Sequence, residues 1–125
     1  MSLEYPPIFT LCTADSDVDA LLTDSSRTRV YAFGFVPEQP QAPYVVWQVI
    51  FGQPDNCLAG APESDQWTVQ VNCYSKTMSE AREVGGAVRN ALQLEGFINN
   101  YRADEYDPVT RLYGVAFDWS GFVQR

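Results

Sequence analysis

The clearest pattern in the chain is a strict alternation of apolar and polar residues over residues 66–75. The odd positions are apolar and most of the even ones are polar: Trp67, Val69, Val71 and Cys73 alternate with Gln66, Thr68, Gln70 and Asn72. A period of two places successive side chains on opposite faces of a strand. This segment is therefore predicted to be a β-strand with one buried face and one polar face.

A capped helix is predicted directly after this strand, over residues 77–94. It begins with Thr77-Met78-Ser79-Glu80, the S/T-x-x-E spacing of a capping box. One stripe of the helix is apolar, and the opposite side carries Arg82 and Arg89. Gly85 and Gly86 interrupt it, at a cost of about 1 kcal/mol each relative to alanine. A close approach of the helix to the sheet at this point is the expected compensation.

The first half of the chain gives weaker signals. Pro7 is predicted to open a helix, and Asp15-Ser16 to divide the segment into two short helices before a polar turn at residues 23–28. Residues 29–36 are predicted to form a strand, followed by a proline-rich loop over residues 37–43.

Residues 44–51 are predicted to form a central strand with both faces covered, because Gln48 is the only polar residue in an otherwise apolar run. Residues 52–65 are predicted to form a long loop rich in Gly, Pro, Asp and Glu. A loop of that length inside a compact domain is usually functional or mobile.

The end of the chain completes the fold prediction. Two strands are expected over residues 97–105 and 112–123, joined by a turn at residues 106–110. Helices are thus segregated from runs of strands. This order predicts a single α+β domain over residues 1–125, with an antiparallel (mixed) sheet of about five strands and helices packed on one face.

The charge balance and the spacing of the cysteines disfavour some classes of function. The chain has 16 acidic and 8 basic residues, a net charge of −8, and no histidine. An acidic surface repels phosphate, so nucleic-acid binding is disfavoured; solubility is the usual reason for such acidity, and passage past nucleic acid without adhesion is a rarer one. Cys12 and Cys73 are expected to pack as small hydrophobes and Cys57 to be an exposed thiol. Their wide spacing does not fit a zinc site.

No targeting or membrane segment is predicted. The N-terminal residues lack the pattern of a signal peptide, and no apolar run approaches the ~20 residues of a membrane span. A soluble protein of a reducing compartment, without membrane association, is the expectation.

The sequence predicts no enzyme. Without histidine, neither a Ser-His-Asp nor a Cys-His arrangement can be built. No glycine-rich phosphate loop is present. Asp104-Glu105-Tyr106-Asp107 offers carboxylates for acid/base work or Ca²⁺, but the spacing fits no cation loop, and a solvated acidic hairpin tip is the favoured interpretation. We expect no catalytic, cofactor or metal site.

Several polar residues are instead candidates for contacts with another subunit. The polar row that includes Gln70 and Asn72 is either a solvated sheet face or a surface toward a subunit or channel. The arginines of the helix are candidates for pairing with an acidic patch on an adjacent copy, the alternative being a solvated helix face. The full set of candidates is Asp55, Glu63, Asp65, Gln70, Asn72, Arg82 and Arg89.

A family resemblance rests on segments in a fixed order along nearly the whole chain. They are Pro7-Ile8-Phe9-Thr10-Leu11, Ala42-Pro43-Tyr44-Val45-Val46-Trp47-Gln48, Asn56-Cys57-Leu58-Ala59-Gly60, Val69-Gln70-Val71-Asn72-Cys73-Tyr74, Glu80-Ala81, Ala87-Val88-Arg89-Asn90-Ala91-Leu92, the turn at Tyr106-Asp107-Pro108 and the strand of residues 112–119. In order and spacing, this set resembles the tail completion proteins of long-tailed bacteriophages and prophages, also called tail terminator or tail-to-head joining proteins.

The resemblance implies a structural protein without cofactor. Such a subunit would form a homohexameric ring that caps the head-proximal end of the tail tube, ends tube polymerisation and joins tail to head. Its partners would be further copies of itself, the tail tube protein and the head-tail connector protein, with DNA passing through unbound. It would be assembled in the bacterial host cytoplasm and remain in the virion. The alternative is a small-ligand or peptide-binding α+β module that uses Trp67, Tyr74 and the loop of residues 52–65.

Overall fold

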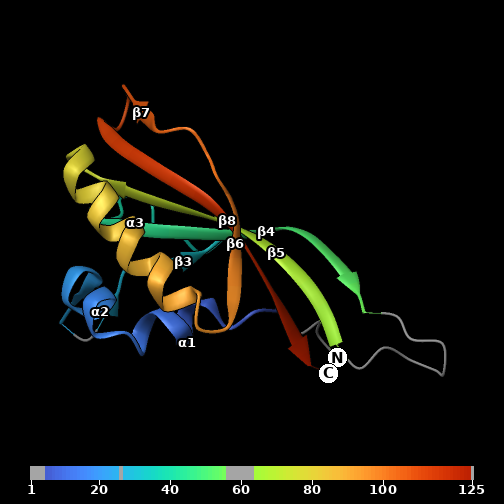
Figure 1. Ribbon diagram of the computed structural model, residues 1–125. Coiled ribbons are helices and arrows are strands. Elements are labelled where there is room, and N and C mark those ends of the chain that lie inside the picture. Colours follow the sequence, from blue (N-terminus) through green and yellow to red (C-terminus); the bar gives the residue numbers. More distant parts are fainter. Residues whose placement is uncertain (1–4, 26, 56–63, 125) are drawn as a thin grey trace.

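The central element of the protein is a mixed β-sheet, seen in a computed structural model that describes residues 5–25, 27–55 and 64–124 (Figure 1). Six described strands form the sheet in the order β3-β4-β5-β8-β6, with β7 also paired to β8. Only β3 and β4 are parallel. The strands are β3 (Val30–Ala32), β4 (Tyr44–Pro54), β5 (Ser64–Ser75), β6 (Gly96–Tyr101), β7 (Glu105–Asp107) and β8 (Leu112–Gln124). The predicted α+β class is confirmed.

The helices α1 (Ile8–Thr13), α2 (Ser16–Leu22) and α3 (Met78–Leu92) lie together on one side of the sheet (Figure 1). The predicted break between the first two is confirmed, because the Asp15 carboxylate accepts hydrogen bonds from the amides of Asp17 and Val18 and so caps α2. The start of α3 is confirmed as well. Thr77 Oγ1 accepts a hydrogen bond of 3.2 Å from the Glu80 amide.

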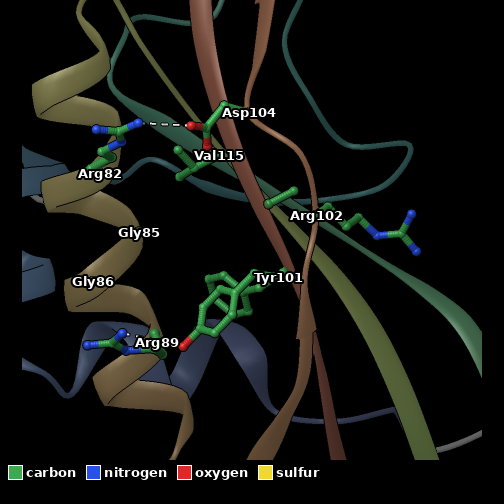
Figure 2. Close-up of a pocket in the computed structure, with 10 residues that line it drawn as sticks. Arg82, Gly85, Gly86, Arg89, Tyr101, Arg102, Asp104 and Val115 are labelled. Atoms are coloured by element: carbon green, nitrogen blue, oxygen red, sulfur yellow. Dashed lines mark hydrogen bonds and ion pairs between the residues drawn. The ribbon is translucent and has the colours of Figure 1, made fainter.

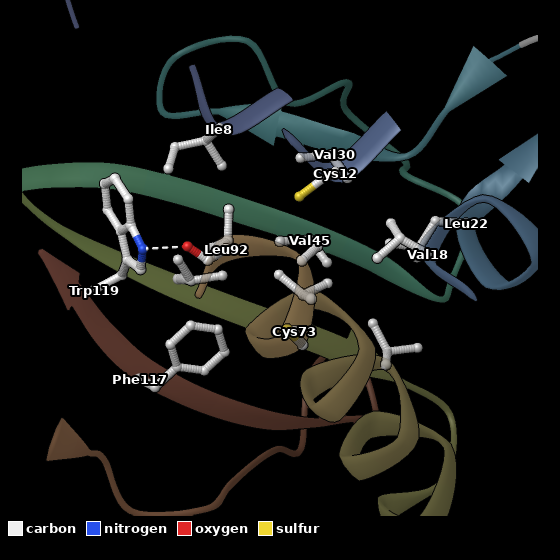
Figure 3. Packing of buried hydrophobic residues seen from close by; sticks show 14 of the residues in the cluster. Ile8, Cys12, Val18, Leu22, Val30, Val45, Cys73, Leu92, Phe117 and Trp119 are labelled. Carbon is white, nitrogen blue, oxygen red and sulfur yellow. Dashed lines mark hydrogen bonds between the residues drawn. The ribbon is translucent and has the colours of Figure 1, made fainter. Parts of the chain in front are cut away.

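The hydrophobic core fills the space between the helices and the sheet (Figure 3). The odd residues Val69, Val71 and Cys73 of β5 are fully buried, as the alternation predicts. Trp119 of β8 is the largest fully buried side chain, and its indole Nε1 donates a 2.8 Å hydrogen bond to the Leu92 carbonyl. This bond fastens the last turn of α3 to the sheet.

The prediction that both faces of the second strand are covered is wrong. Strand β4 lies next to β3 near the sheet edge, and Val45 is its only buried residue. Ile50 and Phe51 are 39% and 57% exposed. Helices cover only the first part of β4, so the apolar composition of the second part does not reflect burial in this chain.

Both ends of the loop predicted at residues 52–65 are strand instead, because β4 continues to Pro54 and β5 starts at Ser64, and residues 56–63 lie outside the described residues. The two strands pair as far as Pro54 and Asp65, and the register shifts between Val49 and Phe51, a bulge that increases local twist. The paired ends, residues 50–55 and 64–67, curve away from the helical layer (Figure 1). We call this projecting hairpin the arm.

Other predicted boundaries change in smaller ways. The strand expected at residues 29–36 is reduced to β3, and the polar turn at residues 23–28 contains a two-stranded hairpin of β1 (Thr23–Asp24) and β2 (Arg27–Thr28). The strand expected at residues 97–105 ends at Tyr101, and β7 takes up part of the predicted turn. Pairing with β8 decides where β6 ends and where β7 lies.

The buried thiols predict a loss of stability at alkaline pH. Burial, helped by the charge of Asp15, raises the pKa of Cys12 from 9.0 to about 12, and burial also raises the pKa of Cys73. Above the ordinary thiol pKa of 9.0, the unfolded chain loses protons that the folded chain keeps. The free energy of unfolding should therefore fall by about 1.4 kcal/mol per pH unit for each thiol, with no such loss below that pH.

Urea unfolding at a series of pH values checks this expectation. The double variant Cys12→Ala, Cys73→Ala should show a shallower alkaline decline than the natural chain. Parallel declines would contradict the assignment to the thiols.

Candidate functional site

A groove with a volume of about 210 Å³ runs between α3 and the β6–β8 side of the sheet (Figure 2). We call it the arginine groove. Its lining residues are Arg82, Gly85, Gly86, Arg89, Tyr101, Arg102, Asp104, Val115, Ala116 and Phe117. Arg82 and Arg89, two of the predicted contact residues, are thus brought together in one groove. They lie two turns apart on α3 and therefore project from the same side of the helix.

The two arginines differ in what they contact. Arg82 forms an ion pair of 2.9 Å with Asp104, with side chains 66% and 48% exposed. An exposed ion pair of this kind contributes about 0–1 kcal/mol to stability. Arg89 donates 3.3 Å hydrogen bonds to the Tyr101 hydroxyl and the Asn90 amide oxygen, and it forms no ion pair within the described residues. Arg89 is thus a cation held only by neutral groups of the described chain.

The two adjacent glycines of α3 have different surroundings. A Cβ on Gly85 would lie 2.8 Å from Val115 Cγ2, so the predicted close approach of helix and sheet is confirmed there. A Cβ on Gly86 would meet nothing within 4 Å. For Gly86 the predicted close approach is wrong. Its missing side chain leaves the groove open.

The second candidate surface is the sheet face opposite the helices, on which no helix of the described chain packs (Figure 1). Gln70 and Asn72 lie side by side on it, with Gln70 Nε2 donating a 3.2 Å hydrogen bond to Asn72 Oδ1. A further hydrogen bond of 2.8 Å joins the hydroxyls of Thr68 and Ser120. The polar row is therefore partly paired within the sheet, as well as partly exposed.

An ion pair that the sequence did not reveal lies on the same face. Arg102 donates hydrogen bonds of 2.9 and 3.1 Å to the two carboxylate oxygens of Asp118, which is only 6% exposed. The hydrogen bond with Asp118 raises the pKa of Arg102. Figure 2 shows the Arg102 guanidinium pointing away from α3 and the groove. Pairing of β6 with β8 brings the two residues together across 16 positions of sequence.

The predicted acidic contact residues fall on or near the arm. Asp55 is exposed at the end of β4, and it is joined to Ser64 by a backbone hydrogen bond of 2.9 Å and a side-chain one of 3.2 Å. Asp65 lies within the ladder, opposite Pro54 and Val123. Glu63 and Cys57 lie outside the described residues. Of the two described acidic candidates, Asp55 is exposed and Asp65 is half-buried in the ladder.

The two aromatic residues of the alternative ligand platform do not come together, and most of its loop lies outside the described residues. Trp67 and Tyr74 occupy odd and even positions of β5, so they point to opposite faces. Trp67 stacks on Tyr5 with ring centroids 5.0 Å apart, whereas Tyr74 packs on Tyr44 at 5.2 Å. No pocket described here is lined by both.

The described residues offer little for other chemistry. Among them, no group of three or more Cys, Asp or Glu side chains is placed to hold a metal ion. The acidic segment of residues 104–107 is divided, because Asp104 pairs with Arg82 while Glu105–Asp107 forms β7. No described helix combines the length and apolar character needed to cross a membrane.

The described residues thus form a small α+β protein with an arginine groove, a polar sheet face that no helix covers, and a projecting arm. A family model described as "Tail completion protein gp17" matches residues 6–123. The chain therefore belongs to this family, and it is a structural tail protein.

A solved structure shares the fold. It is a chain from a structure described as "Virion of native gene transfer agent (GTA) particle", with 16% sequence identity and a TM-score of 0.66. The similarity covers 94% of the present chain and 92% of that chain. A comparison with curated protein sequences found no match.

Proposed function

We propose that this protein forms a homohexameric ring that caps the head-proximal end of the tail tube, ends its polymerisation and joins tail to head. Its partners in this role are further copies of itself, the tail tube protein and the head-tail connector protein. The ring acts by contact and requires no cofactor. It is assembled in the bacterial host cytoplasm and then stays in the virion.

The observation that carries the proposal is the family match over residues 6–123, because it spans both candidate surfaces and all of the sheet except the last residue of β8. Two properties of the chain support it. The net charge of −8 disfavours adhesion of DNA that passes through the ring. The arm and the uncovered sheet face provide surface for more than one kind of contact.

Molar mass in solution, measured by light scattering with and without isolated tail tubes, tests the proposal. We expect a species about six times heavier than the 14.0 kDa chain, or co-sedimentation with the tubes. Electron microscopy of particles made without the protein should show tails of irregular length that are not attached to heads. The proposal would be contradicted if the protein stayed monomeric and did not bind the tubes, and if particles made without it had normal tails.

A further inference from the structure

We propose that the arginine groove of one copy receives the arm of a second copy, with Asp55 of the arm paired to Arg89 of the groove. This contact rests on the proposed function, since it requires that copies associate. It assigns the association to two defined surfaces of the chain.

Charge selects the groove as the acceptor. Copies that each carry a net charge of −8 repel one another, so a contact that brings a carboxylate of one copy to a cation of the next is favoured. Arg102 is already paired with the carboxylate of Asp118, and Arg29 is half-buried and donates to the carbonyls of Leu21 and Pro43 in its own chain. Arg82 and Arg89, by contrast, lie in one groove.

The present contacts of these two arginines are easily exchanged. Arg89 has only neutral hydrogen-bond acceptors at 3.3 Å in the described chain, so an incoming carboxylate adds an ion pair that is not there already. The ion pair of Arg82 is exposed and weakly held, so its rearrangement costs little.

The apolar parts of groove and arm also match. Val115 and Phe117 line the groove between the arginines, and Gly86 leaves it open from the helix side. The arm carries Phe51, which is 57% exposed, four residues before Asp55. Four residues of extended strand span about 13 Å, and two turns of helix about 11 Å. An arm laid along the groove with its carboxylate at Arg89 therefore spans the apolar lining and places Phe51 at its far end, beside Arg82.

The positions of the two surfaces make the contact one between copies. In Figure 1 the arm projects on the side of the molecule away from α3, so it points away from the groove of its own chain. A donor surface and an acceptor surface on different parts of one subunit give a head-to-tail contact. Repetition of such a contact closes into a ring when the rotation between neighbours allows it.

Sedimentation of single variants tests this contact. Arg89→Glu, Asp55→Lys and Gly86→Leu should each raise the concentration for half-assembly about tenfold or more, because the first two place like charges together and the third fills the groove. Matched controls are Arg111→Glu, an exposed reversal away from the groove, and Glu83→Leu, an exposed α3 position that does not line it. Both controls should assemble normally, and all five should keep the monomer's far-UV spectrum.

A mixture of Arg89→Glu and Asp55→Lys chains gives the sharpest readout. Each contact between the two kinds of chain is then oppositely charged, so alternating chains should assemble although neither does so alone. Rings of the natural chain that tolerate Arg89→Glu and Gly86→Leu would overturn this contact and leave the proposed function standing. Variants that still form the ring but no longer bind the tail tube would also overturn it, because the groove would then be a binding site for the tube protein. Failure of the natural chain to assemble at all would contradict the proposed function itself.

Discussion

Replacing Trp119 with alanine is expected to lower the free energy of unfolding by about 3–5 kcal/mol. Trp119 is 1% exposed and packs between α3 and the sheet, so its removal leaves a large cavity in the core. It also removes the hydrogen bond that the indole donates to the Leu92 carbonyl. Urea unfolding followed by far-UV circular dichroism measures the change.

Trp119→Phe is the matched variant, because it keeps most of the ring volume but loses the indole N–H. We expect it to destabilise the protein by about 1–3 kcal/mol, less than Trp119→Ala, because the Leu92 carbonyl loses the indole donor and keeps only the 3.2 Å hydrogen bond from the Glu95 amide. Equal effects of the two variants would mean that the hydrogen bond, rather than the packing, accounts for the loss. A loss below about 1 kcal/mol for alanine would contradict the position of Trp119 in the core.

Replacing Gly121 with alanine is expected to cost about 1–3 kcal/mol of unfolding free energy. A Cβ at this position would lie 2.4 and 2.6 Å from two carbons of the Trp119 ring and 3.1 Å from the Glu95 carbonyl oxygen. The ring is fully buried and cannot move aside without disturbing the packing around it. The same unfolding measurement applies.

Two comparisons make the Gly121 expectation specific. Combined with Trp119→Ala, the Gly121→Ala change should cost much less than it does alone, because the clashing ring is gone. Gly86→Ala should stabilise the monomer by up to about 1 kcal/mol, since it gains helix propensity in open space. Additive effects of Trp119→Ala and Gly121→Ala would contradict the contact between them.

Stability and assembly are expected to respond to different residues. Trp119 and Gly121 lie in or against the core, so their variants should lower monomer stability and reduce assembly only as a consequence. Arg89 and Asp55 are on surfaces that contribute little to the monomer. Their reversal should therefore weaken assembly while the unfolding midpoint stays nearly unchanged, which separates a contact role from a folding role.

The sequence by itself determined the elements whose signals are local. The alternation in β5 predicted the buried face for Val69, Val71 and Cys73, which all face the core, whereas Trp67 on the same pattern is only partly buried. The caps at Asp15 and Thr77 located two helix starts, because a cap depends on residues only a few positions apart. These signals also sufficed to predict the α+β class with helices on one face.

Tertiary structure alone decided how far each face is covered and which distant residues meet. The apolar run in β4 predicted a strand correctly, but the exposure of Phe51 depends on where the helical layer ends. The pairs Arg82–Asp104 and Arg102–Asp118, and the groove open at Gly86, depend on how α3 and β6 lie against β8. Local periodicity reports which way a side chain points. What lies opposite that side chain is set by the pairing and packing of segments distant in the sequence.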